Sequence, residues 1–184
     1  FTTISEAMPP DDLVDSLNRY FSVMVDIIME HNGVIDKYIG DAIMAFFGAP
    51  VSREDDPFQS VLAGVEMTEG LRRFNQKQKE LGKPEFKIGV GINYGTVTVG
   101  NIGTERKMDY TVIGDMVNLA SRLEGLTKRY GEEIIIAESL FPHVKDVFPW
   151  RLLDTVAVKG KTKGVRIFTV RRSLDEETEQ AWRH

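Results

Sequence analysis

Two charged side chains lie inside an otherwise apolar stretch of this sequence, VIDKYIGDAIMAFFG at residues 34–48. The pair Gly40-Asp41 is typical of a type II′ turn, so the stretch is expected to form a β-hairpin with Asp41 at its tip. Lys37 lies three residues before Gly40. A charged group in a buried sheet is costly unless it is paired, bound to a metal or turned toward a ligand. Both residues are therefore functional candidates, with a surface ion pair of Lys37 with Asp36 or Asp41 as the simpler alternative.

A second group of polar residues occurs in the segment MDYTVIGDMVNLASRLEGL, residues 108–126. Leucines recur there at helical spacing and predict a buried stripe. Asn118 and Arg122 are four residues apart, so they share a neighbouring face of the same helix. A solvated polar face is the simpler interpretation of this pair. Two further features favour a site for a negatively charged ligand instead. They are Thr111, on a strand that leads into the helix, and the basic turn at residues 159–163.

The composition excludes several classes of function. The 184 residues include 23 Lys and Arg against 28 Asp and Glu, and the net charge of −5 argues against a nucleic-acid partner. The chain has no cysteine, which excludes disulfides and thiolate metal sites. Its three histidines show no zinc-binding spacing. No apolar run approaches the roughly 20 residues of a membrane span and no signal peptide is visible, so we expect a cytoplasmic domain without a membrane segment.

The elements that would position the candidate residues follow from hydrophobic periodicity. One helix is expected between the start signal at residues 9–12 and the stop signal at residues 31–33. Two more are expected at residues 58–81 and 115–130. Strands are expected in the 34–48 hairpin, where residues 42–47 would be buried on both faces. Residues 86–94 are expected to form a strand that pairs with 96–102. A further strand is expected at 133–136, and a last hairpin should join 152–159 with 165–171. This order predicts one α+β domain over residues 1–184, with helices on one side of a single sheet.

Taken together, the motifs resemble the catalytic domain of class III adenylate and guanylate cyclases. The similarity runs from Phe1 to about Val170 and rests on five blocks in the family order: FTTISE, DKYIGDAIMAFFG, GINYGTVTVGNIG, YTVIGDMVNLASRLE and VKGK. Lys37 and Thr111 resemble the bacterial Lys/Thr subclass, which includes cyanobacterial and soluble-type adenylate cyclases. The resemblance implies a ferredoxin-like cyclase fold, with a mostly antiparallel sheet, helices packed on it, and a head-to-tail homodimer with shared active sites.

The resemblance also implies which residues hold metal and phosphate. Asp41 would be one of two carboxylates that bind two divalent cations, Mg²⁺ or Mn²⁺, with the second carboxylate upstream of Phe1. Lys159 would hold the terminal phosphates. Phe1 and Thr2 would belong to a loop whose backbone N–H groups cradle phosphate.

Four further residues are implied in base reading and catalysis. Lys37 and Thr111 would contact the purine base, with Lys37 serving the other active site of the dimer. Asn118 would orient the ribose, and Arg122 would stabilise charge on the phosphoryl oxygens.

The predicted reaction is the conversion of ATP to 3′,5′-cyclic AMP and pyrophosphate by metal-assisted attack of the ribose 3′-hydroxyl on the α-phosphate. Lys37 offers only donors and suits adenine N1, whereas Thr111 permits either purine, so a guanylate cyclase stays an alternative. A non-catalytic regulatory dimerisation domain of the same fold is a second alternative. Against it stands the complete set Lys37, Asp41, Asn118, Arg122 and Lys159. Sensor domains are expected in the full-length protein.

Overall fold

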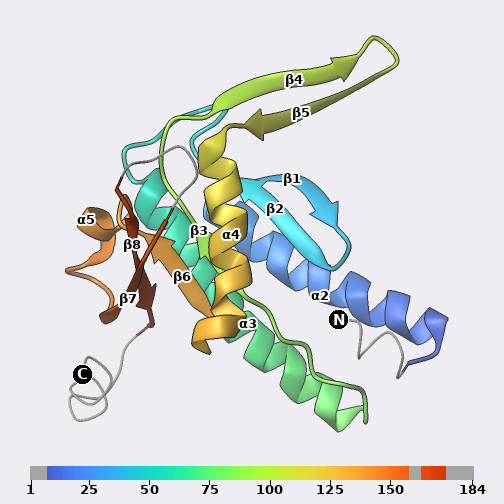
Figure 1. Cartoon of the computed structure of the whole chain (residues 1–184). Helices are drawn as coiled ribbons and strands as arrows, with labels where there is room; N and C mark the ends of the chain where they lie inside the picture. The colour runs from blue at the N-terminus through green and yellow to red at the C-terminus, as the bar shows by residue number, and fades with distance from the viewer. Residues whose placement is uncertain (1–7, 158–162, 173–184) are drawn as a thin grey trace.

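The computed structural model describes residues 8–157 and 163–172, in which helices and strands alternate along the chain (Figure 1). The helices are α2 (Pro10–Glu30), α3 (Asp56–Glu80), α4 (Asp115–Tyr130) and the short α5 (Phe141–Val144). The described part of the chain contains no helix that is long and apolar enough to cross a membrane. Three predicted site residues, Phe1, Thr2 and Lys159, lie outside the described residues.

The strands of the described residues form three sheets. Two are hairpins, β1 (Val34–Ile39) with β2 (Ala42–Phe46) and β4 (Thr98–Thr104) with β5 (Lys107–Ile113). The third has four strands in the order β3 (Val90–Ile92), β6 (Ile134–Ala137), β8 (Val165–Val170), β7 (Trp150–Val156). Every pairing is antiparallel except that of β3 with β6. The predicted α+β class and mostly antiparallel pairing are confirmed.

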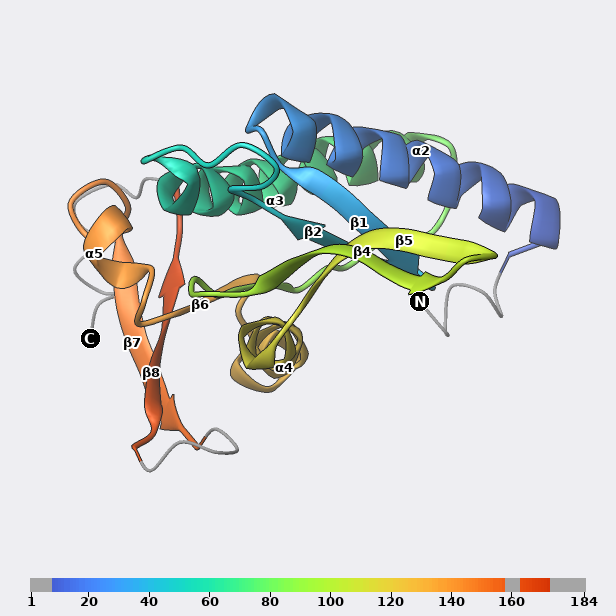
Figure 2. The ribbon, with the colours of Figure 1, turned by 90° about the horizontal axis from the view of Figure 1, so that it is seen from above.

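Strand β6 is buried along its whole length, because helices cover both faces of the four-stranded sheet (Figure 2). Ile134 and Ile136 join a core cluster with residues of α3, whereas Ile135 and Ala137 join a second cluster with residues of α4. Successive side chains of a strand point to opposite faces, so each face of β6 needs its own cover. The expectation of helices on one side of the sheet is therefore wrong.

The predicted pairing of residues 86–94 with 96–102 is also wrong. β3 pairs instead with β6, with Val90 opposite Ile134, and β4 pairs with β5, with Gly100 opposite Thr111. A short apolar run carries no signal for its partner, and a parallel partner lies far away in the sequence. The last hairpin, β7 with β8, has the predicted antiparallel pairing.

The hairpin predicted at residues 34–48 is present, and Gly40 has φ 63° at its turn. Its second strand is less buried than predicted. Within β2 only Phe46 is buried, Ala42 is exposed, and the three residues between them are half-buried. The apolar run 42–47 therefore lies in a two-stranded sheet and is not buried on both faces within the described structure.

Helix α4 lies unusually close to the strand region around β3. A Cβ atom on Gly91 would stand 2.2 Å from the backbone nitrogen of Glu124, and one on Gly89 would stand 2.0 Å from the hydroxyl oxygen of Thr127. Only residues without a side chain allow such an approach. The glycines of the GVG segment therefore set the depth at which α4 packs on the sheet.

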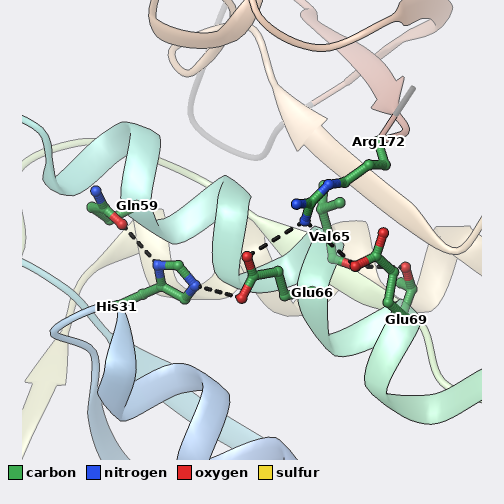
Figure 3. Close-up of polar contacts among 7 residues, drawn as sticks. His31, Gln59, Val65, Glu66, Glu69 and Arg172 are labelled. Atoms are coloured by element: carbon green, nitrogen blue, oxygen red, sulfur yellow. Dashed lines mark hydrogen bonds and ion pairs between the residues drawn. The ribbon is translucent and has the colours of Figure 1, made fainter. Parts of the chain in front are cut away.

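The C-terminal end of α2 is linked to α3 by His31 (Figure 3). Its Nδ1 lies 2.8 Å from the amide oxygen of Gln59, and its Nε2 lies 2.9 Å from the carboxylate of Glu66. Burial of the ring acts to lower the pKa of His31, but the hydrogen bonds with Glu66 and Gln59 raise it more, so the pKa lies above 6.5. The hydrogen bond from His31 in turn lowers the pKa of Glu66, which also contacts Arg172 at 3.4 Å.

We expect this link to stabilise the fold in a defined pH window. The contribution of charged His31 is complete below its unfolded value near 6.5 and is lost as pH rises through the raised folded pKa. The contribution of Glu66 is present above its unfolded value near 4.5 and is lost as pH falls through the lowered folded pKa. His31→Leu should therefore cost about 1 kcal/mol at pH 5.5, a shift in Tm of roughly 2–4 °C, and much less at pH 8.5.

The measurement is thermal unfolding followed by circular dichroism at both pH values. His143→Leu, which removes an exposed histidine of α5, is the matched control and should show no such pH dependence. An equal loss of Tm for His31→Leu at pH 5.5 and 8.5 would contradict the charged link.

Candidate active site

Asp41 lies at the tip of the β1–β2 hairpin and is half-buried. Its carboxylate makes no hydrogen bond or ion pair within the described part of the chain. Burial, followed by the negative charge of Asp41, raises the pKa of Tyr20 in α2 to about 12. An unpaired, partly exposed carboxylate is a suitable ligand for a hard cation such as Mg²⁺. Residues 8–157 and 163–172 contain no group of three or more acidic or histidine side chains that could hold a metal, so Asp41 does not belong to such a group among them.

Strand β1 contains an irregularity at Asp36. Ile35 pairs with Ala45 and Lys37 pairs with Met44, so Asp36 is the extra residue of a β-bulge. In a regular strand, neighbouring side chains point to opposite faces. A bulge changes the direction of side chains in its strand, and the Lys37 ammonium lies 3.2 Å from the Asp36 carboxylate at this point.

The Asp36 carboxylate lies between the two residues predicted to read the base. Its side chain is 1% exposed. Its Oδ2 accepts hydrogen bonds from the Thr111 hydroxyl at 2.5 Å and from the Val112 backbone N–H at 3.2 Å. Lys37 Nζ lies 3.2 Å from the other oxygen, Oδ1. The structure thus brings Lys37 and Thr111 to one carboxylate, and the ion pair that was the simpler explanation of Lys37 is also present.

Asn118 and Arg122 lie on one exposed face of α4, while Leu119 and Leu123, which directly follow each of them, are buried. This is the division of faces that the leucine spacing predicts. The Arg122 guanidinium donates a hydrogen bond to the carbonyl of Ala157. Ala157 is the last described residue before Lys159, which follows it by two positions in the sequence.

The described contacts do not join these groups into one closed site within a single chain. No hydrogen bond or ion pair connects Asp41 with Asn118 or Arg122 in residues 8–157 and 163–172. The sequence alone indicates Asp36 only as an ion-pair partner of Lys37. Its position in the sequence is a signal for a wider role, because it directly follows two apolar residues at the start of a strand. A carboxylate that is buried at such a position needs hydrogen-bond donors around it.

Comparison with known proteins gives consistent matches. The family model for the adenylate and guanylate cyclase catalytic domain matches residues 1–171. An adenylate cyclase of Anabaena cylindrica is 42% identical over 93% of this chain. Crystal structures of the adenylyl cyclase CyaB from P. aeruginosa and of the guanylyl cyclase Cya2 have TM-scores of 0.85 and 0.82 at 36% and 38% identity.

The extent of these matches differs between sequences and structures. The two solved structures cover 95% and 96% of this chain, and 90% and 88% of their own chains are matched. The match covers 34% of the Anabaena cylindrica relative, and it covers 26% of an adenylate cyclase of Rhizobium meliloti and 8% of one of Dictyostelium discoideum.

Proposed function

This chain belongs to the adenylate and guanylate cyclase catalytic domain family, and from that premise we propose that it converts ATP to 3′,5′-cyclic AMP and pyrophosphate. The observation that carries the proposal is the meeting of Lys37 and Thr111 at the buried carboxylate of Asp36. Recognition of a purine edge requires a few polar groups that lie close together. Lys37 and Thr111 come from separate hairpins and form such a group.

In the proposed reaction the ribose 3′-oxygen attacks the α-phosphorus in line, its proton is lost to solvent, and pyrophosphate leaves. Asp41 fits one ligand of a divalent-cation site, because its carboxylate is partly exposed and unpaired among the described residues. A bound Mg²⁺ or Mn²⁺ pair would make the 3′-hydroxyl more acidic and neutralise charge on the triphosphate.

The other residues act on the substrate directly. The exposed guanidinium of Arg122 would stabilise charge on the phosphoryl oxygens, and Asn118, one turn earlier on the same face, would orient the ribose. Lys159, Phe1 and Thr2 are proposed to hold the phosphates.

The preference for ATP rests on Lys37. Its ammonium offers only hydrogen-bond donors, which suit adenine N1, whereas guanine N1 carries a hydrogen. A buried donor that faces another donor costs roughly 1–3 kcal/mol, which corresponds to a preference of about 5- to 150-fold. A guanylate cyclase is the second candidate, because the similar solved structures include a guanylyl cyclase as well as an adenylyl cyclase.

We also propose a head-to-tail homodimer with two shared sites. The long β4–β5 hairpin projects from the body of the molecule (Figure 1) and exposes large apolar side chains, namely Ile102, Met108, Tyr110 and Ile113. Projecting apolar surfaces of this kind mark protein–protein contacts. A dimer also accounts for the lack of contact between Asp41 and the α4 residues in one chain, since each site would combine groups from both subunits. Sensor domains elsewhere in a longer protein are proposed to control the pair.

The role of Asp41 can be tested by Asp41→Asn, which keeps the size of the side chain and removes its charge. We expect kcat for ATP to fall roughly 100-fold or more, because a metal stabilises such a transition state by several kcal/mol. Cyclic AMP formation with Mg²⁺ or Mn²⁺ is the measurement, with unchanged Tm as proof of folding. Asp146→Asn, at an exposed carboxylate beyond α5, is the control. Full activity of Asp41→Asn would make Asp41 a turn residue only.

The shared-site dimer predicts complementation between two inactive variants. A mixture of Asp41→Ala and Arg122→Ala chains should recover about a quarter of wild-type activity, because half of the dimers are mixed and each mixed dimer has one intact site. Differently tagged chains, co-purified through both tags, would establish that mixed dimers exist. Mixed dimers without activity would refute sharing of Asp41 and Arg122 between subunits.

The base preference predicts a selective effect at Lys37. Lys37→Met keeps the length of the side chain and removes its donors, so kcat/KM for ATP should fall about tenfold more than kcat/KM for GTP. Lys128→Met, at an exposed position of α4, should change neither value. Equal losses on both nucleotides would remove Lys37 from base reading, and a wild type that prefers GTP would replace the adenylate assignment with the guanylate one.

A further inference from the structure

We propose that Asp36 determines the choice of purine by fixing the hydrogen-bonding direction of Thr111. The inference rests on the proposed function and concerns the same site. Asp36 is a positioning residue here, because it is buried behind Lys37 and Thr111 and would act on the base only through them.

The Thr111 hydroxyl has a single hydrogen, and the structure commits it to Asp36. The hydroxyl oxygen lies 2.5 Å from Asp36 Oδ2, and an ionised carboxylate can only accept hydrogen bonds. The Val112 N–H donates to the same Oδ2 at 3.2 Å, and the Lys37 ammonium lies 3.2 Å from the other oxygen. One buried carboxylate therefore accepts two hydrogen bonds and lies beside a positive charge.

A hydroxyl whose hydrogen is engaged can offer only its lone pairs to a bound base. It can accept a hydrogen bond from the adenine amino group, but it cannot donate one to guanine O6 without breaking its bond to Asp36. Thr111, considered alone, permits either purine. Beside Asp36 it becomes an acceptor, and the ambiguity is resolved in favour of adenine.

Lys37 completes the pattern as a donor. Its Nζ lies 3.2 Å from Asp36 Oδ1, so the ion pair holds the ammonium beside the carboxylate. An ammonium has three hydrogens, and those that do not face Asp36 can be donated to a bound base. An acceptor at Thr111 next to a donor at Lys37 matches the amino group and N1 of adenine and mismatches O6 and N1–H of guanine at both points.

The carboxylate that contacts both residues lies at the bulge in β1. Without the extra residue at Asp36, the side chains of Asp36 and Lys37 would point to opposite faces of the hairpin. With it, the carboxylate reaches both Lys37 on its own strand and Thr111 on β5.

The test compares kcat/KM for ATP and GTP in the full-length protein carrying Asp36→Ala or Asp36→Asn. Asp36→Ala releases the Thr111 hydroxyl, which can then donate to guanine O6, so the ratio of ATP to GTP should fall about tenfold. In Asp36→Asn the amide oxygen still accepts from Thr111 and Val112, although the charge that pairs with Lys37 is lost, so the ratio should fall less than in Asp36→Ala.

A double-mutant cycle separates this role from a structural one. In a Thr111→Val background, Asp36→Ala should change the ATP to GTP ratio much less, because no hydroxyl is left to reorient. The same change of ratio in both backgrounds, or equal losses of kcat/KM for ATP and GTP, would overturn the inference. If Asp36→Ala does not fold, Thr111→Val and Thr111→Ser decide the matter. Thr111→Val should impair ATP and spare GTP, whereas Thr111→Ser should retain the ratio, and equal impairment of both nucleotides by Thr111→Val would refute it.

Failure of the proposed function would be seen separately. A wild-type protein that forms neither cyclic nucleotide would refute the cyclase activity. The preference of the site for adenine or guanine would then be measured by displacement of a fluorescent methylanthraniloyl-ATP with ATP and with GTP in the same variants. Stronger displacement by ATP that is reduced in Asp36→Ala would support the role of Asp36, and equal displacement by both nucleotides in the wild type would overturn it.

Discussion

The depth at which α4 packs on the sheet is the constraint on which the candidate site depends. The helix backbone reaches Gly91 so closely that any side chain there would collide with it. Because this contact fixes the helix, Leu123 points into the core while Asn118 and Arg122 stay exposed on another face. The same placement fixes the end of β5 that carries Thr111, since only a short turn separates that strand from α4. A packing requirement in the core thus sets the position of polar groups at the surface.

The buried carboxylate of Asp36 is the second fixed point, and it joins elements that the sheets leave separate. The β1–β2 and β4–β5 hairpins share no backbone pairing, yet Asp36 bonds to both the side chain of Thr111 and the backbone of Val112. Burial of a charge is costly unless donors and an opposite charge surround it, and here Lys37 supplies that charge. The relative position of the two hairpins is therefore specified by an electrostatic demand as well as by apolar packing.

Features set by local sequence could be predicted, whereas those set by distant contacts could not. The bounds of α4 and the turn at Gly40 follow from helical spacing and turn chemistry, which act over a few residues. The parallel partner of β3 and the two-sided burial of β6 depend on segments far away in the chain. The bulge at Asp36 was not predictable either, because a one-residue irregularity leaves no mark on an apolar pattern. The family resemblance named Lys37 and Thr111, but only the structure shows that they share a carboxylate.

The comparison structures bear on where base selectivity can reside. An adenylyl and a guanylyl cyclase both superimpose on this chain with similar TM-scores, so the backbone arrangement itself does not distinguish the two purines. Selectivity must then come from a few donors and acceptors, and a site built around hydrogen bonds rejects the wrong partner by leaving buried groups unpaired. A threonine hydroxyl can either donate a hydrogen bond to a base or accept one from it until a neighbouring acceptor takes its hydrogen. For such a residue, specificity is a property of the buried group behind it as much as of the group that touches the base.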